Sequence, residues 1–145
     1  MTTRYTKMTE LALSKRGACI GLSTAYDEKF PPENIIDGDR NSFWSTTGMF
    51  PQEFVISLPS TAEIDAIKMT CSNVKHMCIE KSMKQDPVHF ERLSEKEMSN
   101  LDGQMQIDDF PIPTTRVNHL RFVIKSGYDH FAAVYQVNVS GSLED

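Results

Sequence analysis

The sequence predicts an all-β fold, an antiparallel β-sandwich of about eight short strands with at most one or two short helices. Three observations lead to this prediction. Apolar and polar residues alternate over several short runs, the runs are separated by Gly, Pro, Asn, Asp and Ser, and only one segment carries the signals of a well-formed helix. Alternation of this kind is typical of strands with one buried face. The pattern fits an immunoglobulin-like sandwich and a jelly roll equally well.

The first half of the chain contains three of the candidate strands. Residues 18–24 form the first. Residues 54–58 alternate apolar and polar side chains, and Pro59 should end that strand. Residues 64–71 follow, with three apolar side chains on one face. The residues before these strands are polar, and we expect one weak helical turn over 7–13.

The second half of the chain supplies five further candidate strands. The clearest covers residues 119–126, where three apolar side chains face one way and His119, Arg121 and Lys125 face the other. On that polar face His119 is expected to be solvated rather than catalytic. The remaining candidate strands cover residues 77–80, 88–93, 104–107 and 133–140.

One segment, residues 94–100, predicts a short surface helix. Ser94 and Glu97 have the spacing of a capping box, and the residues between and after them favour helices.

The size and charge of the chain restrict its function. Its 145 residues suit a single domain, which we place at 17–142 between a polar lead-in of 1–16 and a tail of 143–145. A net charge of −5 argues against nucleic-acid binding. No apolar run reaches the roughly 20 residues needed to cross a bilayer, and the first ten residues are too polar for a signal peptide. We therefore expect a protein that is not secreted.

Recognised catalytic patterns are missing from the sequence. It contains no Gly-x-Ser-x-Gly elbow, no phosphate-binding Gly-x-x-x-x-Gly-Lys loop and no His-Glu-x-x-His zinc motif, so we expect no enzyme. His76 and Cys78 on one strand face could begin a zinc site, but no second pair has the spacing to complete it. The three cysteines, which also include Cys19 and Cys71, are expected to be free and buried.

The most informative segment is the loop at residues 34–44. It holds two Asp, two Asn and one Ser around Gly38, a density of oxygen-bearing side chains that suits Ca²⁺. An EF-hand is excluded, because alignment on Asp37 places Ser42 where that loop requires Gly and Gly48 where it requires Glu. The alternative is a polar turn that bends the chain through Asx hydrogen bonds and binds no metal.

The same loop resembles a known family. Asn-Ile-Ile-Asp-Gly at 34–38, a polar stretch, Trp44 and an apolar strand resemble the discoidin, or coagulation factor five/eight type C, galactose-binding-like jelly rolls, as do residues 79–90 and 135–141. This resemblance implies a jelly roll and a structural calcium ion, with Trp44 filling the core beneath the loop. The ligands that it implies are Asn34, Asp37, Asp39, Ser42 and Gln136, the last a neutral amide where calcium-binding relatives have Glu.

A narrower resemblance covers nearly the whole chain. Residues 27–38, 43–54, 120–124 and 128–132 are similar to a family of small jelly-roll subunits of the intraflagellar transport B complex. That similarity implies a non-catalytic subunit that serves ciliary cargo transport in the cytoplasm and cilium or flagellum. It also implies a stable heterodimer with a Rab-like small GTPase subunit.

Two loops are candidates for binding that partner. Met49 and Phe50 lie in one, and Tyr128 and Phe131 lie in the other. The alternative is that both loops close the ends of the sandwich. A second possible function, a carbohydrate-binding module on the same fold, is less well supported, because the fucose-binding relatives use an Arg-x-Asp run that this sequence lacks.

Overall fold

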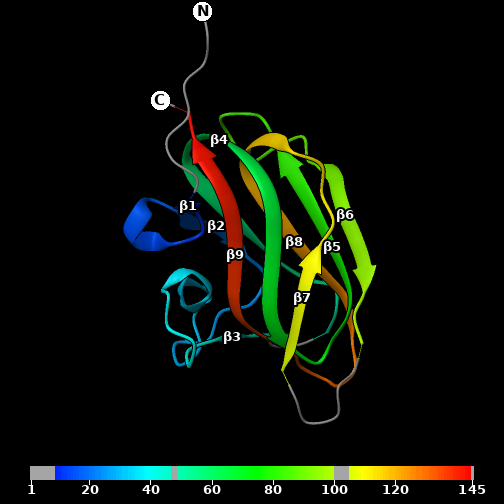
Figure 1. Ribbon diagram of the computed structural model, residues 1–145. Coiled ribbons are helices and arrows are strands. Elements are labelled where there is room, and N and C mark those ends of the chain that lie inside the picture. The colour runs from blue at the N-terminus through cyan, green and yellow to red at the C-terminus, as the bar shows by residue number, and fades with distance from the viewer. Residues whose placement is uncertain (1–8, 47–48, 100–104, 145) are drawn as a thin grey trace, which may run out of the picture.

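The protein folds as two packed layers of antiparallel strands, as the sequence predicts (Figure 1). The computed structural model describes residues 9–46, 49–99 and 105–144. Their strands are β1 Thr9–Glu10, β2 Cys19–Ser23, β3 Trp44–Ser45, β4 Gln52–Ser72, β5 Val74–Ser82, β6 Glu91–Glu97, β7 Gln106–Phe110, β8 Thr115–Gly127 and β9 Ala133–Leu143.

One long strand, β4, belongs to both layers. Its first part lies between β2 and β8, whereas its last part lies between β7 and β9. The register with β8 shifts between Ser57 and Ala62, and Pro59 lies within this irregular stretch. The prediction of two strands separated by Pro59 is therefore wrong. Proline is tolerated here because no ladder bond is required of it at the break in pairing.

The N-terminal region is more extended than predicted. Residues 7 and 8 of the expected helical turn lie outside the described residues, and Thr9 and Glu10 form β1, paired with the end of β9. Within the described residues the helical segments are two short 3-10 turns, η1 Ser14–Arg16 and η2 Pro32–Ile36.

The predicted helix at 94–100 is also wrong. Its first residues form β6, in which Ser94 lies opposite Ile79 of β5, and residue 100 lies outside the described residues. Ser94 is buried, and Glu95 contacts His76 of β5 and Lys125 of β8. Six residues of β6 pair with β5, and this pairing outweighs the local preference for a capped helical turn.

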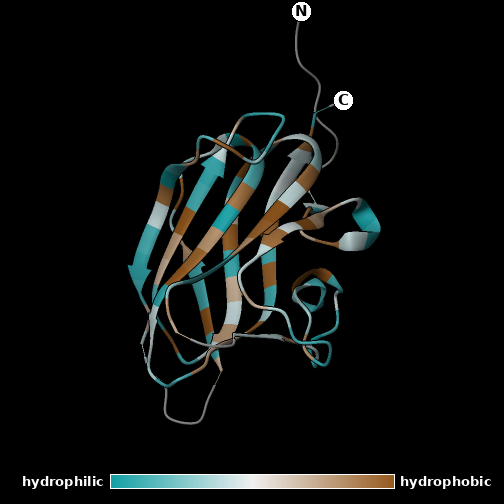
Figure 2. Cartoon of the chain, turned by 180° about the vertical axis from the view of Figure 1, so that it is seen from behind, coloured by the Kyte–Doolittle hydropathy of each residue, from teal (hydrophilic) through white to brown (hydrophobic). Residues whose placement is uncertain are grey.

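The core lies between the two layers. Figure 2 shows hydrophobic and hydrophilic residues alternating along the strands. Trp44 is fully buried and meets Phe54 edge to face, with 5.2 Å between ring centroids, while Phe54 stacks on Phe122 at 4.9 Å. The predicted role of Trp44 as a core residue beneath the loop is confirmed.

Two predictions about single residues need correction. His119 is only 6% exposed, because the loop after β5 folds over it. Its Nε2–H donates to the carbonyl of Gln85 at 2.9 Å, so Nδ1 is left to accept from the Ser57 hydroxyl at 2.7 Å. Cys19 is exposed, whereas Cys71 and Cys78 are free and buried as expected.

Candidate metal loop and partner-binding end

The loop after η2 is fixed to the core at both ends. Pro32 begins η2, where its missing N–H costs nothing, and Ile35 and Ile36 are buried. Gly38 follows with a φ of 80°, a left-handed conformation that glycine adopts readily. Trp44 closes the loop by entering the core, where its indole N–H donates to the carbonyl of Ala25 at 2.9 Å.

Four oxygen-bearing groups of this loop converge. The Oγ atom of Ser42 lies 2.6 Å from Oδ2 of Asp37, 3.2 Å from the carbonyl of Asp39 and 3.4 Å from the carbonyl of Asn34. The group therefore comprises one carboxylate, one hydroxyl and two backbone carbonyls. Hard oxygen donors of this kind are the ligands that Ca²⁺ prefers.

Further hydrogen bonds fix the backbone of the loop around the Ser42 hydroxyl. The side-chain amide of Asn34 donates to the carbonyl of Phe43 at 2.9 Å, and Asp37 Oδ1 accepts from the amide of Asp39 at 2.8 Å. Asp39 Oδ1 in turn accepts from the amide of Asn41 at 2.8 Å. The two aspartate bonds form Asx turns, so they also fit the alternative of a polar turn without metal.

The fifth predicted ligand, Gln136, is less clearly part of this group. It lies on β9 opposite Thr70 of β4 and lines a neighbouring cavity together with Arg40 and Asn41. Over 9–46, 49–99 and 105–144, no group of three His, Cys, Asp or Glu side chains is placed to hold a metal. An ion in the loop would therefore have one carboxylate, that of Asp37, and would otherwise depend on backbone carbonyls and the Ser42 hydroxyl.

The pair considered as the start of a zinc site has other partners. Nε2 of His76 lies 2.5 Å from Oε1 of Glu95, and this hydrogen bond, followed by one from Lys125, lowers the pKa of Glu95. Burial, followed by the charges of Glu80 and Glu95, raises the pKa of the Cys78 thiol. A thiol that resists deprotonation is a poor metal ligand.

The two predicted partner-binding loops meet at one end of the sandwich. Met49 and Phe50 line a cavity of about 550 Å³ together with Asp129 and His130 of the second loop. Met49 is 86% exposed and Phe131 49% exposed. Both side chains are therefore available to a partner.

Phe50 and Tyr128 have structural contacts of their own. Phe50 packs against the core, and a Cβ on Gly127 would lie 2.7 Å from its ring. The hydroxyl of Tyr128 donates to the carbonyl of Met98 at 2.6 Å, and its amide donates to the carbonyl of Asn73 at 2.9 Å. Phe50 therefore contributes to closing this end of the sandwich, whereas Tyr128 is anchored by hydrogen bonds and is still 38% exposed.

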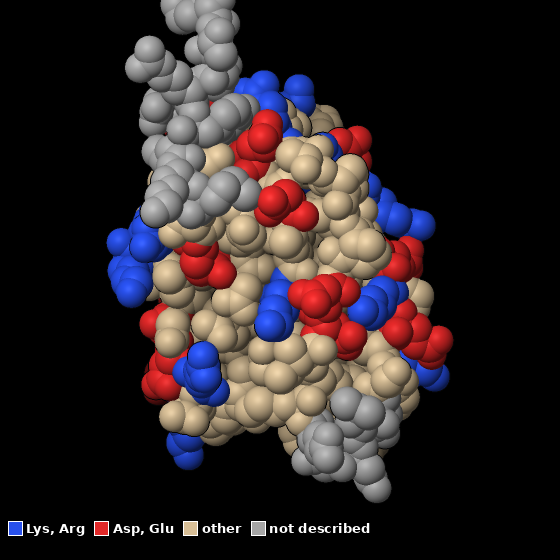
Figure 3. All heavy atoms as spheres, in the orientation of Figure 1, with Lys and Arg blue, Asp and Glu red and all other residues tan. Residues whose placement is uncertain are grey.

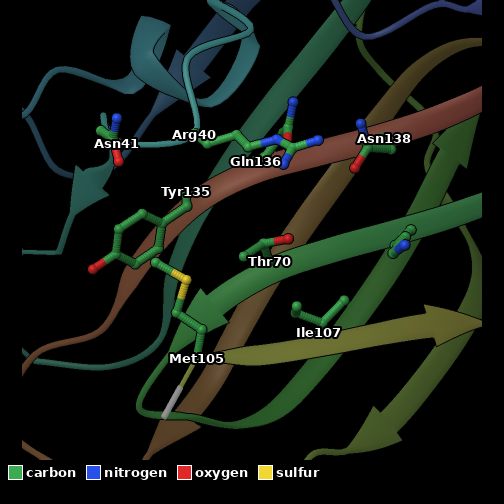
Figure 4. A pocket seen from close by; sticks show the side chains of 9 residues that line it. Arg40, Asn41, Thr70, Met105, Ile107, Tyr135, Gln136 and Asn138 are labelled. Atoms are coloured by element: carbon green, nitrogen blue, oxygen red, sulfur yellow. The ribbon is translucent and has the colours of Figure 1, made fainter. Parts of the chain in front are cut away.

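Sequence reasoning missed a second cavity, which has a volume of about 640 Å³ and lies on the outer face of β9, β4 and β7. Figure 4 shows Arg40 extending from the loop toward Gln136, with Thr70 and Ile107 on the neighbouring strands. Alternation within residues 64–71 already placed Lys68 and Thr70 on the solvent face. The pairing of β4 with β7 was the unpredictable part.

The comparisons with known proteins agree with this architecture. The family model of the F5/8 type C domain matches residues 20–137. A relative from Homo sapiens, "Intraflagellar transport protein 25 homolog", is 42% identical over 92% of this chain and 93% of its own. The chain belongs to the intraflagellar transport protein 25 family.

A second member of the intraflagellar transport protein 25 family, from Chlamydomonas reinhardtii, is 37% identical over 92% of this chain and 70% of its own. Among solved structures, a fucolectin from Morone saxatilis superposes with a TM-score of 0.78 and 17% identity, covering 99% of this chain and 50% of that one. A Clostridium perfringens module, CBM32-3, gives 0.77 and 17% identity, covering 91% and 94%. At such identities the likeness concerns the fold alone. Among the described residues, no helix of this family member has the length and apolar character to cross a membrane.

Proposed function

We propose that this protein is a non-catalytic subunit of the intraflagellar transport B complex, acting in ciliary cargo transport as a heterodimer with a Rab-like small GTPase subunit. The observation that carries the proposal is the likeness to relatives named for intraflagellar transport, at 37–42% identity over about 92% of the chain. A second support is the exposed apolar surface at the end of the sandwich.

The GTPase is proposed to dock on the partner-binding end, defined as Met49, Phe50, Tyr128 and Phe131. Met49 and Phe131 project into solvent beside the cavity of about 550 Å³. Methionine and aromatic side chains are enriched where protein interfaces are fully desolvated. Phe50 packs against the core and Tyr128 is held by two hydrogen bonds, so these two residues of the surface are ordered without a partner, which lowers the ordering cost of binding.

Charge substitution at this surface should weaken the heterodimer. Met49→Asp combined with Phe131→Asp is expected to reduce affinity for the GTPase at least tenfold, about 1.4 kcal/mol, because two carboxylates would be desolvated at the interface. The measurement is isothermal titration calorimetry with the GTPase subunit, after co-purification from ciliated cells has recovered it.

The matched control for this experiment is Ile107→Asp, since Ile107 is 60% exposed on a different face. It should leave GTPase affinity unchanged. If ciliated cells yield the protein as a free monomer, the heterodimer proposal fails. If the heterodimer forms but the double variant binds normally, only the docking surface is wrong.

We also propose that the loop binds one structural Ca²⁺ ion through Asn34, Asp37, Asp39 and Ser42, with Gln136 completing the set from β9. Without an ion, the Ser42 hydroxyl is the hydrogen-bond donor shared by the oxygens of Asn34, Asp37 and Asp39. A bound ion would supply positive charge to these oxygens. Only one carboxylate, that of Asp37, points into the group, so we expect modest affinity. The role of the ion would be to hold the loop against β9.

Removing that carboxylate should remove the response to calcium. For the unaltered chain, Ca²⁺ at a hundred times its Kd should add about 2.7 kcal/mol to the free energy of unfolding, and EDTA should reverse this. Asp37→Ala should lower the melting temperature in Ca²⁺ and make it insensitive to EDTA. Differential scanning calorimetry in Ca²⁺ and in EDTA measures both effects.

Asp27→Ala is a closely matched control, because Asp27 Oδ1 accepts from the amide of Lys29 at 2.9 Å in the same kind of turn. Its effect should be small and equal in both buffers. Equal behaviour of the two variants, with no calcium response in the unaltered chain, would favour the metal-free polar turn.

A further inference from the structure

A groove runs across the outer face of the layer formed by β9, β4 and β7. Thr70 lies at its centre, flanked in register by Ile107 of β7 and Gln136 of β9. Arg40 forms a wall from the loop, and Met105 and Tyr135 line the same groove (Figure 4). The groove measures about 640 Å³, enough to receive several side chains of a bound chain.

The charge of the groove is opposite to that of the protein. Arg40 and Lys68 line it, and among the described residues no carboxylate does, although the chain carries a net charge of −5. Within the described part of the chain neither cation forms an ion pair, even though Asp109 lies opposite Lys68 in register. The cations that do form ion pairs with carboxylates are Lys75, Lys81, Arg92, Lys96, Arg116, Arg121 and Lys125. The two groove cations are thus available to an external anion.

Apolar side chains lie between these charges. Ile107 is 60% exposed and Met105 43% exposed, and Tyr135 is half-buried against Phe43, with 5.0 Å between ring centroids. Figure 3 shows that much of this face is uncharged, with acidic side chains scattered over it and some of them directly beside basic ones. A free inorganic anion would use the cations but leave the apolar surface bare. The best complement therefore carries both carboxylates and apolar groups.

We propose that this groove binds an extended acidic segment of another protein, in which carboxylates and apolar side chains share one face of the strand. The carboxylates would pair with Arg40 and Lys68, and the apolar side chains would cover Ile107 and Met105. In an extended chain residues two apart point to the same side, so a segment with Glu and Leu two residues apart presents both kinds of side chain to the groove. The groove shares no residue with the partner-binding end, so this proposal adds a second contact to the one proposed for the GTPase.

The test uses three synthetic hexapeptides and the full chain labelled with ¹⁵N. Their sequences are Glu-Ser-Leu-Ser-Glu-Ser (the Glu/Leu peptide), Lys-Ser-Leu-Ser-Lys-Ser (the Lys/Leu peptide) and Glu-Ser-Ser-Ser-Glu-Ser (the Glu/Ser peptide), so that residues 1, 3 and 5 share one face of an extended chain. Only the Glu/Leu peptide should cause saturable shifts at the amides of Thr70, Ile107 and Gln136. Arg40→Glu combined with Lys68→Glu should weaken its binding at least tenfold, and raising the salt concentration should weaken it further.

Matched controls separate this proposal from general charge effects and from the GTPase. Lys15→Glu combined with Lys29→Glu changes the net charge equally, lies off the groove and should leave peptide binding intact. Ile107→Asp should abolish peptide binding without affecting GTPase recovery, and Met49→Asp with Phe131→Asp should do the reverse. Failure of one proposal is therefore distinguishable from failure of the other.

Several results would overturn the groove proposal. They are equal binding of the Lys/Leu peptide, no saturation at millimolar peptide, or shifts confined to other faces. Equal shifts with inorganic phosphate or with a sialylated sugar would indicate a small anionic ligand instead of a protein segment.

Discussion

Trp44→Ala is expected to lower the free energy of unfolding by about 3–5 kcal/mol, the usual cost of truncating a buried aromatic residue. Trp44 is fully buried, packs on Phe54 and donates to the carbonyl of Ala25. Truncation leaves a cavity and an unpaired carbonyl together. A small domain is stable by only about 5–15 kcal/mol, so this one change could consume most of the margin.

Urea denaturation followed by circular dichroism measures this loss, since Trp44 is the single tryptophan and its fluorescence disappears with it. Trp44→Phe is the graded control, because it keeps most of the ring contact and loses only the hydrogen bond and part of the volume. The free energy of unfolding of Trp44→Phe should lie between those of the unaltered chain and Trp44→Ala. A loss below about 1 kcal/mol for the alanine variant would contradict the place of Trp44 in the core.

Gly141→Ala should be nearly as damaging, for the opposite reason. A Cβ at this position would lie 2.3 Å from the carbonyl oxygen of Glu63 and 2.9 Å from Cα of Ile64. Both are backbone atoms of β4, so relief requires β9 to move away from the strand beside it. We expect a loss of about 3 kcal/mol, at the upper end of overpacking costs, or a chain that fails to fold.

Gly21→Ala is the comparison, since its added Cβ would meet only side-chain atoms, the nearest being Oγ of Ser57 at 3.0 Å, and no backbone atom within 4 Å. It should be well tolerated in the same thermal melt. Similar melting temperatures for both variants would mean that β9 and β4 are less closely packed than described.

The fold was predictable because alternation is a property of the chain itself. Leu120, Phe122 and Ile124 alternate along residues 119–126, and all three are buried in β8. The errors occurred where a distant strand decides the outcome. Ser94 and Glu97 have the local signals of a helix, yet β5 recruits them into β6, and Pro59 interrupts pairing without ending β4.

The loop was partly predictable for a similar reason. Asn34, Asp37, Asp39 and Ser42 are close in sequence, so their convergence follows from one turn around Gly38. Gln136 lies about a hundred residues away, and its position depends on the pairing of β9 with β4. The groove could not be foreseen, because Arg40, Lys68 and Ile107 meet only when the whole layer is assembled.

The position of β9 has a consequence for how the protein is made. This strand forms late in the sequence, yet it pairs with β1, β3 and β4. In a nascent chain on the ribosome, β1, β3 and β4 therefore lack their pairing partner, and their apolar side chains stay exposed, until β9 emerges. The β5–β6 hairpin can form before β9 is made, but the layer that contains β9 closes only after this strand has emerged, and chaperone contact is most useful during that interval.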